Sequence, residues 1–326
     1  MSRLFLCFLG VVLLFNFSAD AKNYKGAELY STNLVKYGRF DIRMRTISGS
    51  GTISSFFLYY DDSYKGPPEP WREIDIEVLG KSDNVFQSNI ITGNADNKTT
   101  SEELHTYNKL SEDYHTYTLE WTPDYIAWFF DGEEVRRSTD AQVTDCQLKE
   151  MSYRFNLWIS DAPSWAGQFN PSILPVYQYI NWIKYSKYTP GSGPNGTNFT
   201  PEWEDDFNSF DSRRWGKGDW TFDGNLVDFT GDNIVIKDGY CIICLTDNNK
   251  TGFSGKVPED KGVSIKNDKQ RIKKPFSTGY SNPVGSYLLT LDGRRLPFNL
   301  NLNERSKSGV WIKKEKDTFI PVLRIN

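Results

Sequence analysis

Hydrophobic and polar residues alternate along most of the chain from residue 24 onward. In RFDIRMR the apolar residues Phe40, Ile42 and Met44 are separated by charged residues, and HTYTLEW repeats the pattern. A period of two places successive side chains on opposite faces of a β-strand. Amphipathic runs with a helical period are absent or short in this sequence. The alternation therefore predicts an all-β protein built as a sandwich or jelly roll.

Turn signals separate the predicted strands. Asp131-Gly132 lies between two apolar runs in YIAWFFDGEEVRR and predicts a hairpin, and Asp238-Gly239 predicts another. At 189–201 the alternation stops, and Pro, Gly, Ser, Thr and Asn dominate the sequence. This composition indicates a linker or a long surface loop. Strand patterns then resume and fade near residue 255.

The last part of the chain differs from the rest in charge. Residues 256–326 carry 15 Lys and Arg against 7 Asp and Glu, a net +8, whereas the preceding residues carry 23 against 35, a net −12. Such an asymmetry marks a separate appendage. We therefore expect a β-domain over 22–255, a linker over 256–284 and a small β module over 285–326.

The first 21 residues have the features of a secretory signal peptide. Arg3 precedes an apolar run over 4–17, and small residues end at Ala21. The run of 14 residues is short for a membrane span, although an uncleaved anchor is the alternative. We expect a secreted, extracellular or cell-surface protein with no membrane span after cleavage. The net charge of −4 argues against a nucleic-acid partner.

The segment WREIDIEVLG places three acids in five positions. On a strand Glu73, Asp75 and Glu77 share one face, while the isoleucines between them share the other. Aligned like charges weaken a sheet, so a solvated edge strand is the structural alternative. Two carboxylates that flank a glycosidic bond are the minimum apparatus for glycoside hydrolysis. The middle acid raises the pKa of Glu77 by like-charge repulsion and helps it to stay protonated.

At these residues the sequence resembles glycoside hydrolase family 16, whose signature is E-[ILV]-D-[IV]-E. The segments GAELYS, YGRFDIRM, GTISSFFLY and RFNLWIS are also similar to the family, and the likeness covers about 24–250. The motif without an extra residue resembles the lichenases, although the xyloglucan transglycosylases share it. The likeness implies a concanavalin-like jelly-roll sandwich. The segment RWGKGDWTFDGN follows the acids instead of preceding them, which resembles the circularly permuted type of lichenase.

The resemblance implies a role for each matching residue. Glu73 is the nucleophile, Glu77 the general acid/base and Asp75 the auxiliary carboxylate. The tryptophans that match sugar-stacking positions are Trp71, Trp158, Trp165 and Trp220, with core packing as the alternative. The residues that match positions bonded to sugar hydroxyls are Tyr59, Gln87, Asn89, Arg154 and Asn156, with structural hydrogen bonding as the alternative. Asp61 stands where similar sequences have Asn, so that sugar contact is open.

The resemblance also implies a structural calcium ion but no cofactor for catalysis. The matching ligands are Asn181, Asp206 and the backbone of Gly239, and oxygen ligands of this kind suit calcium. The expected partner is a β-glucan, and the expected reaction is retaining hydrolysis of mixed β-1,3-1,4 linkages by a monomer. The alternatives are another family 16 hydrolase or transglycosylase, acting on laminarin or xyloglucan, and a non-catalytic carbohydrate-binding jelly roll. The tail motifs LDGRRL and SGVWIKK resemble short bacterial secretion and sorting modules, with an unrelated β-unit as the alternative.

Overall fold

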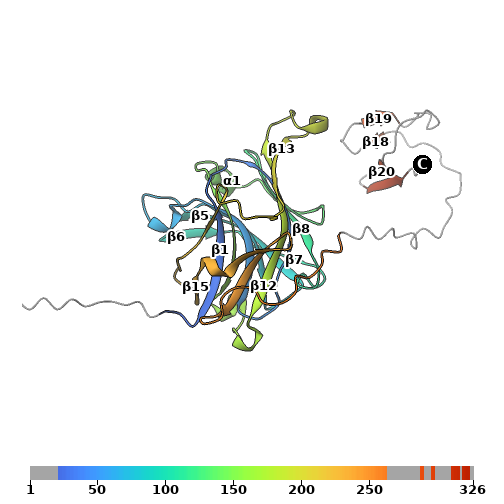
Figure 1. The fold of residues 1–326 in the computed structure, drawn as a ribbon. Coiled ribbons are helices and arrows are strands. Elements are labelled where there is room, and N and C mark those ends of the chain that lie inside the picture. The colour runs from blue at the N-terminus through green and yellow to red at the C-terminus, as the bar shows by residue number, and fades with distance from the viewer. Residues whose placement is uncertain (1–20, 263–286, 290–294, 298–309, 316–317, 324–326) are drawn as a thin grey trace, which may run out of the picture. The chain divides into compact units, whose positions relative to one another are not determined.

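The computed structural model describes residues 21–262 and four strands nearer the C-terminus. The chain divides into two compact units, Met1–Ser264 and Ile265–Asn326. In the described part of the first unit nearly every element is a strand, and the helices α1 (Ala141–Cys146) and α2 (Pro163–Ala166) are short (Figure 1). The all-β prediction from the alternating pattern is confirmed.

One sheet, called sheet I, carries the acid motif near its middle. Its strands run antiparallel in the order β14-β1-β11-β3-β4-β5, and β6 and β7 both pair with β5. The bounds are β14 (Trp215–Lys217), β1 (Tyr24–Ser31), β11 (Ser152–Ile159), β3 (Thr52–Tyr59), β4 (Glu73–Leu79), β5 (Val85–Asn94), β6 (Asn97–Thr100) and β7 (Glu103–Thr106). The strand β4 is thus hydrogen-bonded on both sides, which holds its side chains in a fixed direction.

The other sheet, called sheet II, is also antiparallel. Its order is β16-β17-β12-β2-β8-β9-β10, and β13 pairs with the second half of β12. The bounds are β16 (Ile234–Lys237), β17 (Tyr240–Asp247), β12 (Val176–Tyr188), β2 (Gly38–Arg45), β8 (His115–Trp121), β9 (Ile126–Phe130), β10 (Glu133–Ser138) and β13 (Phe199–Asp205). The start of β1 pairs with β17 and runs parallel to β15 (Val227–Phe229). The two sheets are therefore joined at β1.

The core lies between the two sheets. Phe40 of β2 packs against Phe56 of β3 with ring centroids 5.4 Å apart, and both residues are fully buried. Ile74 and Ile76 of β4 belong to the same buried cluster. The apolar face of each amphipathic strand thus faces the other sheet, and the polar face points away from it. This is the sandwich that the alternation predicts.

The Asp131-Gly132 turn forms the predicted hairpin between β9 and β10. Both residues have a left-handed backbone, with φ of 46° and 86°. A two-residue turn of this hand matches the twist of the flanking strands, and Asp and Gly adopt it at low cost. Register pairing of Glu133 with Phe130 closes the hairpin, so this part of the sequence prediction is confirmed.

The segment 189–201 is an ordered surface loop that continues into β13, and it is not a free linker. Tyr188 and Phe199 are paired across the hairpin, and the Thr189 amide donates to the Asn198 carbonyl at 2.7 Å. In Figure 1 this hairpin is the yellow projection that carries the β13 label. Strands after the loop belong to both sheets, so one sandwich is built from both sides of it. The permuted order stays a prediction.

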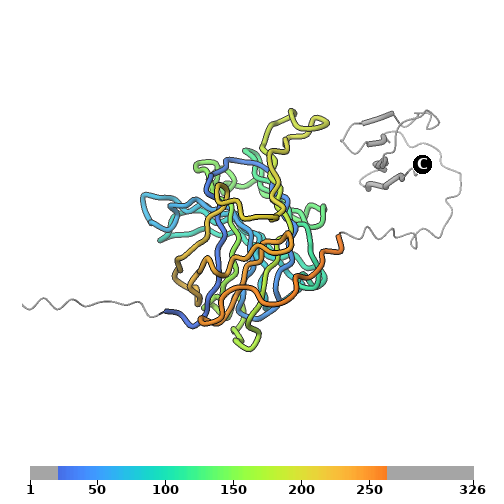
Figure 2. Tube along the Cα trace, viewed as in Figure 1, coloured from blue at the N-terminus to red at the C-terminus, as the bar shows by residue number. Residues whose placement is uncertain are grey.

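Residues 252–262, called the strap, follow β17 and pack on the outer face of sheet II. Val257 is 6 % exposed and lies in a cluster with Tyr114, Tyr179 and Ile242. Figure 2 shows this orange segment crossing the body of the first unit. The prediction that the domain ends at residue 255 and continues as a linker is therefore wrong at its boundary. The alternation of apolar and polar residues ends there because the strap forms no strand. It binds sheet II through a few buried side chains.

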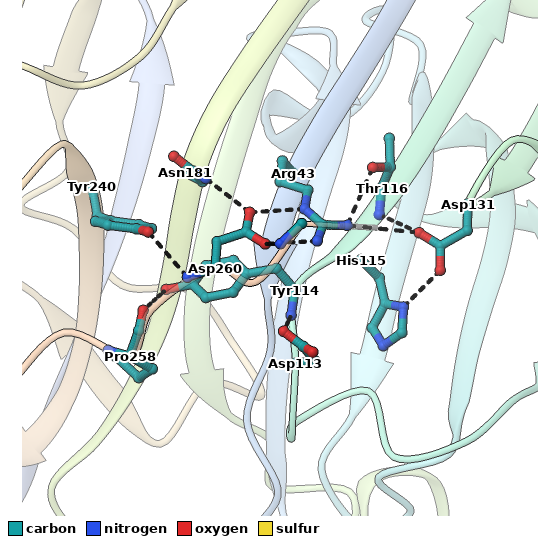
Figure 3. Close-up of polar contacts among 11 residues, drawn as sticks. Arg43, Asp113, Tyr114, His115, Thr116, Asp131, Asn181, Tyr240, Pro258 and Asp260 are labelled. Carbon is teal, nitrogen blue, oxygen red and sulfur yellow. Dashed lines mark hydrogen bonds and ion pairs between the residues drawn. The ribbon is translucent and has the colours of Figure 1, made fainter. Parts of the chain in front are cut away.

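Polar contacts also anchor the strap (Figure 3). Asp260 accepts from Arg43 Nη2 at 2.7 Å and Nε at 2.9 Å, and from Asn181 Nδ2 at 2.8 Å. Tyr114 Oη donates to the Pro258 carbonyl at 3.0 Å. The Arg43 and Asp260 side chains are only 4 % and 7 % exposed. The strap thus covers a buried charge of sheet II and neutralises it.

In the second unit the described residues form one four-stranded antiparallel sheet in the order β19-β18-β20-β21. Its strands are β18 (Tyr287–Leu289), β19 (Arg295–Pro297), β20 (Val310–Glu315) and β21 (Thr318–Leu323). A small β-unit of hairpins was expected over 285–326, and these strands agree with it. The predicted signal peptide and the linker from residue 263 lie outside the described residues. Among the described residues no helix is both long and apolar enough to traverse a lipid bilayer.

Candidate active site

The outer face of sheet I collects the polar residues that the sequence singled out. In β4 the register places Asp75 between Phe57 of β3 and Asn89 of β5, and Glu77 between Ser55 and Gln87. Directly paired residues of antiparallel strands share a face. The face therefore also includes Tyr59 of β3 and Arg154, Asn156 and Trp158 of β11. The structure brings the predicted acids and these predicted contact residues together.

Glu73 is partly buried and has compensating partners. Trp71 Nε1 donates to Glu73 Oε2 at 2.7 Å. The Lys98 ammonium lies 3.3 Å from the centroid of the Trp71 ring, so it occupies one face of the indole. Burial raises the pKa of Glu73 to about 7, while the Trp71 hydrogen bond and the charges of Lys98 and Arg154 oppose the rise. Of the two outer acids, Glu73 is therefore the one with groups that favour its ionised form.

Glu77 has a less favourable environment for charge. Gln87 Nε2 donates to Glu77 Oε2 at 3.2 Å, and Gln87 Oε1 accepts from Trp165 Nε1 at 3.2 Å. Burial, followed by the negative charges of Glu73 and Glu102, raises the pKa of Glu77 to about 8. No cation offsets these causes in the described residues. Glu77 is thus suited to carry a proton at neutral pH, which a general acid requires.

Asp75 is the most buried of the three acids, at 3 % exposure. Its Oδ2 atom makes no hydrogen bond to any residue that the structure describes. Burial and then the charges of Glu73 and Glu77 raise the pKa of Asp75 well above its ordinary value. The predicted repulsion from Asp75 is not among the causes that raise the pKa of Glu77, which are burial and the charges of Glu73 and Glu102. Repulsion within the motif raises the pKa of Asp75 itself, and there burial is the larger cause. The three acids cannot all ionise together, so the site holds at least one proton near neutral pH.

Arg154 and Asn156 are tied into a polar network on β1, β3 and β11. Arg154 donates to Glu28 Oε1 at 2.7 Å and to Asp61 Oδ1 at 2.8 Å. Asn156 donates to Glu28 Oε2 at 3.3 Å and accepts from the Ser55 hydroxyl. Asp61, where similar sequences have Asn, thus holds Arg154 by an ion pair. These contacts give both residues a structural role, whether or not they also contact a sugar.

Glu28 is 3 % exposed on this face and was not predicted from the sequence. Burial raises the pKa of Glu28, and the charge and hydrogen bond of Arg154 oppose that rise. A signal was present, because Glu28 alternates with the buried Ala27 and Leu29 in GAELYS, as the three acids alternate with isoleucines. Its partner Arg154 is 126 residues away in sequence, so the pairing could not be predicted.

Three of the four predicted tryptophans lie in two aromatic groups. Trp158 packs near Trp165 with ring centroids 6.0 Å apart, and against Phe222 at 5.0 Å. Trp220 contacts Tyr30 at 5.2 Å and is 36 % exposed. Phe222, at 39 % exposed, was not predicted, although it follows Trp220 by two residues. Trp165 of α2 and Trp220 of the loop after β14 thus join residues of sheet I.

Asn89 has a direct structural contact, because its Oδ1 accepts from the Ser101 amide at 3.1 Å. Tyr59 packs edge-on against Trp71 at 5.7 Å, and burial, before the charge of Glu73, raises the pKa of Tyr59. Lys98 covers one face of Trp71, so that face cannot stack on a sugar ring. These three predicted contact residues therefore form part of the wall beside Glu73 and Asp75.

Residues 14–184, slightly more than half of the chain, match Glycosyl hydrolases family 16. The chain belongs to glycosyl hydrolase family 16. It is 50 % identical over 244 residues to a protein of Fibrobacter succinogenes named Beta-glucanase, covering 74 % of this chain and 70 % of that protein. It is 34 % identical over 170 residues to a Beta-glucanase of Brevibacillus brevis, covering 52 % of this chain and 63 % of that protein. Among solved structures, the Bacillus licheniformis beta-glucanase matches with 29 % identity and a TM-score of 0.42, covering 48 % of this chain and 70 % of that one.

The predicted calcium ligands of this family 16 chain do not form one set. Asn181 donates to Asp260, which also holds the Arg43 guanidinium, so a second cation at Asn181 would meet a fixed positive charge. Asp206 accepts from the side chain of Asn208 at 2.6 Å. A Cβ added at Gly239 would lie 3.9 Å from the Asp206 carbonyl, so these two residues are neighbours. Asn181 does not fit a calcium site in this arrangement, and calcium binding stays a prediction.

Apart from the predicted calcium ligands, the described residues contain no candidate metal site. No group of three or more His, Cys, Asp or Glu side chains there is placed to hold a metal ion. The described cysteines Cys146, Cys241 and Cys244 are buried and free, and burial is the main cause that raises each thiol pKa. They pack as small apolar residues.

Proposed function

We propose that this family 16 chain is a retaining endo-β-1,3-1,4-glucanase that hydrolyses lichenan and cereal mixed-linkage glucan. The placement of Glu73, Asp75 and Glu77 on one face of β4 is the observation that carries the proposal. The 50 % identity to a protein named Beta-glucanase, over 70 % of that protein, supports the choice of substrate. The motif without an extra residue supports the mixed-linkage specificity within the family.

In the proposed mechanism Glu73 acts as the nucleophile. Its carboxylate attacks the anomeric carbon and forms a glycosyl ester, while Glu77 gives its proton to the leaving oxygen. Glu77 then accepts a proton from water, which attacks the ester and releases a product of retained configuration. The partners of Glu73 favour its charge, whereas burial without a cation favours the proton on Glu77. This difference supports the division of roles.

Asp75 contributes through its charge state. Burial and the charges of Glu73 and Glu77 favour the protonated form of Asp75, and a protonated Asp75 does not repel the charge of Glu73. The role is that of an auxiliary acid, which contacts the reacting pair but makes no bond to the sugar.

The substrate would lie across the outer face of sheet I. The aromatic groups around Trp158 and Trp220 offer flat surfaces for pyranose rings, and Gln87 lies next to Glu77 with an amide for a hydroxyl. Alternative substrates are laminarin and xyloglucan, since transglycosylases of the family share the same motif. A non-catalytic sugar-binding protein is less well supported, because both acids of the pair are present.

We further propose that the chain is exported by its first 21 residues and works outside the cell as a monomer. The C-terminal unit, with its net positive charge from residue 256 onward, would then act in secretion, sorting or surface retention. Export is tested by N-terminal sequencing of the protein recovered from the medium, which should begin at residue 22.

The test of the function is hydrolysis of a panel of glucans by the purified chain. Lichenan should give short oligosaccharides, with little release from laminarin, xyloglucan or carboxymethylcellulose. Proton NMR of the first product should show the β-anomer before mutarotation. The variant E73Q serves as the matched control for contaminating activity. Faster release from laminarin, or longer chains from xyloglucan, would assign the chain to the alternatives, and an inverted first product would contradict the mechanism.

A further inference from the structure

Lys98 is placed beside the acid motif by the hairpin between β5 and β6. It pairs with Gly93, whose carbonyl also accepts from the Trp71 amide at 2.8 Å. Gly93 has a φ of 96°, and a Cβ there would lie 2.2 Å from the Asn97 carbonyl. Only glycine permits so close an approach of the two strands. One residue of the backbone therefore fixes the position of Lys98 relative to Trp71.

Side-chain contacts connect Lys98 to Glu73 through Trp71. The ammonium lies over the indole ring at 3.3 Å from its centroid, and the indole N–H donates to Glu73 at 2.7 Å. A cation on the ring face is attracted by the ring electrons and draws density from the N–H, which strengthens it as a donor. The cation thus supports both the orientation of Trp71 and its hydrogen bond.

Several other charged or titratable groups face Glu73 from the packed strands. They are Asp75 and Glu77 of β4, Glu28 of β1, Arg154 of β11 and Tyr59 of β3. Of these only Arg154 is a cation, and it is already paired with Glu28 and Asp61. Lys98 makes no ion pair with any residue that the structure describes. Its charge is therefore the less committed of the two that act on Glu73.

We propose that Lys98 is a positioning residue, which holds the Trp71 indole on Glu73 and keeps Glu73 ionised beside two other acids. The proposal rests on the assignment of Glu73 as nucleophile. A nucleophilic carboxylate must be charged before it attacks, whereas the general acid must be protonated. A cation that acts on Glu73 and not on Glu77 favours the ionised form of Glu73 while Glu77 keeps its proton. Lys98 does this without a contact to the reacting atoms.

The pKa values agree with this role. Burial raises the pKa of Glu73 to about 7, and Lys98 is one of the causes that lower it. For Glu77 no corresponding cation is present in the described residues, and its pKa rises to about 8. Burial also lowers the pKa of Lys98, while the Glu73 charge opposes that change, as expected for two groups that interact.

The test compares K98M, which keeps the length of the side chain but removes the charge, with K98R, which keeps the charge. In K98M the acid limb of kcat/KM on lichenan should move to higher pH by roughly half to one unit. In K98R the limb should return to within roughly 0.2 units of the wild type. Added salt should reduce the difference between K98M and wild type, since it screens the lost interaction. The control is K187M, because Lys187 is exposed in sheet II.

A second readout does not depend on hydrolysis. In the full chain labelled with carboxyl-¹³C glutamate, the Glu73 signal is identified by its loss in E73Q, and its titration midpoint should rise in K98M by the same amount. If wild type hydrolyses no glucan, this midpoint still tests Lys98. An unchanged midpoint in folded K98M, or a shift that K98R does not reverse, overturns the proposal. If K98M does not melt cooperatively, K98Q takes its place in both measurements.

Discussion

Two clusters of buried charge, one on each sheet, are organised in opposite ways. On sheet I three acids of β4 lie together, and burial with mutual repulsion raises the pKa of Asp75 well above its ordinary value. On sheet II the strap sets Asp260 against Arg43 at 2.7 Å and Asn181 at 2.8 Å. In the described residues the acids of the first cluster form no ion pair, whereas the acid of the second cluster is paired with a guanidinium.

The difference separates a reactive site from a structural one. A hydrogen-bonded ion pair has a fixed geometry and little reactivity. Near neutral pH the paired acid stays ionised, and its protonated form is not accessible. Buried acids without a cationic partner lower the stability of the fold. Their raised pKa values lie near neutral pH, where acid–base catalysis requires them. The sandwich tolerates the acid motif because β4 is held by strands on both sides. The strap network adds to the stability of the same domain.

The largest expected effect is loss of catalysis on sheet I without loss of the fold. E73Q and E77Q should each lower kcat on lichenan by roughly 10³-fold, because one removes the nucleophile and the other the acid. The melting temperature should stay level or rise, since a repelled charge is removed. Steady-state kinetics and calorimetry measure both. With an activated aryl glycoside, azide should restore turnover in one of the two variants.

Near-normal hydrolysis by either variant would show that the acids of sheet I are not the reactive ones. Loss of cooperative melting in both would show instead that the acids hold the fold, which would remove the contrast with the strap network.

A truncation should have the opposite effect, loss of stability without loss of catalysis. A chain that ends at Lys256 should lose about 3–5 kcal/mol of unfolding free energy, because it loses both the buried apolar contacts of Val257 and the ion pair of Asp260 with Arg43. A chain that ends at Gly262 keeps the strap and should unfold as the full first unit does. Denaturant unfolding of both forms measures the difference. Equal stability would show that the strap is dispensable.

A single substitution tests the ion pair alone. D260N should lower the unfolding free energy by about 2–3 kcal/mol, less than the truncation, because Val257 and the rest of the strap stay packed on sheet II. Turnover on lichenan at low temperature should not change. The matched control is D206N, whose carboxylate contacts only the exposed Asn208 in the described residues. A D260N effect no larger than that of D206N would contradict the role given to the strap.

Much of the first cluster was predictable from sequence, and almost none of the second. Local alternation places Glu73, Asp75 and Glu77 on one face of a strand, and a strand within a sheet preserves that face. Arg43 and Asp260 are 217 residues apart in sequence. The segment around Asp260 has no periodic pattern of apolar and polar residues that would predict its structure. The net charge of the tail suggested a boundary at 255, but a few buried anchors decide where the domain ends.

The smallest expected effects are two opposite dependences of stability on pH. Burial raises the folded-state pKa of Glu73 from 4.5 to about 7 and that of Glu77 to about 8, so these acids stabilise the fold when protonated. Their contribution is complete below about pH 4.5 and is lost as the pH rises toward 8. The Arg43 pair holds the pKa of Asp260 below 3.8, against the effect of burial, so its contribution is present above that pH and is lost in stronger acid.

Melting temperatures measured from pH 3 to pH 9 should separate the two contributions. E77Q should flatten the decline between about pH 5 and pH 8 and leave the acid limb as in wild type, whereas D260N should flatten only the limb below about pH 4. The E77Q change should exceed about 1 kcal/mol, since each unit of pKa shift corresponds to about 1.4 kcal/mol and the pKa of Glu77 rises from 4.5 to about 8. If both variants change the same limb, the two clusters are coupled through the sandwich and are not separate devices.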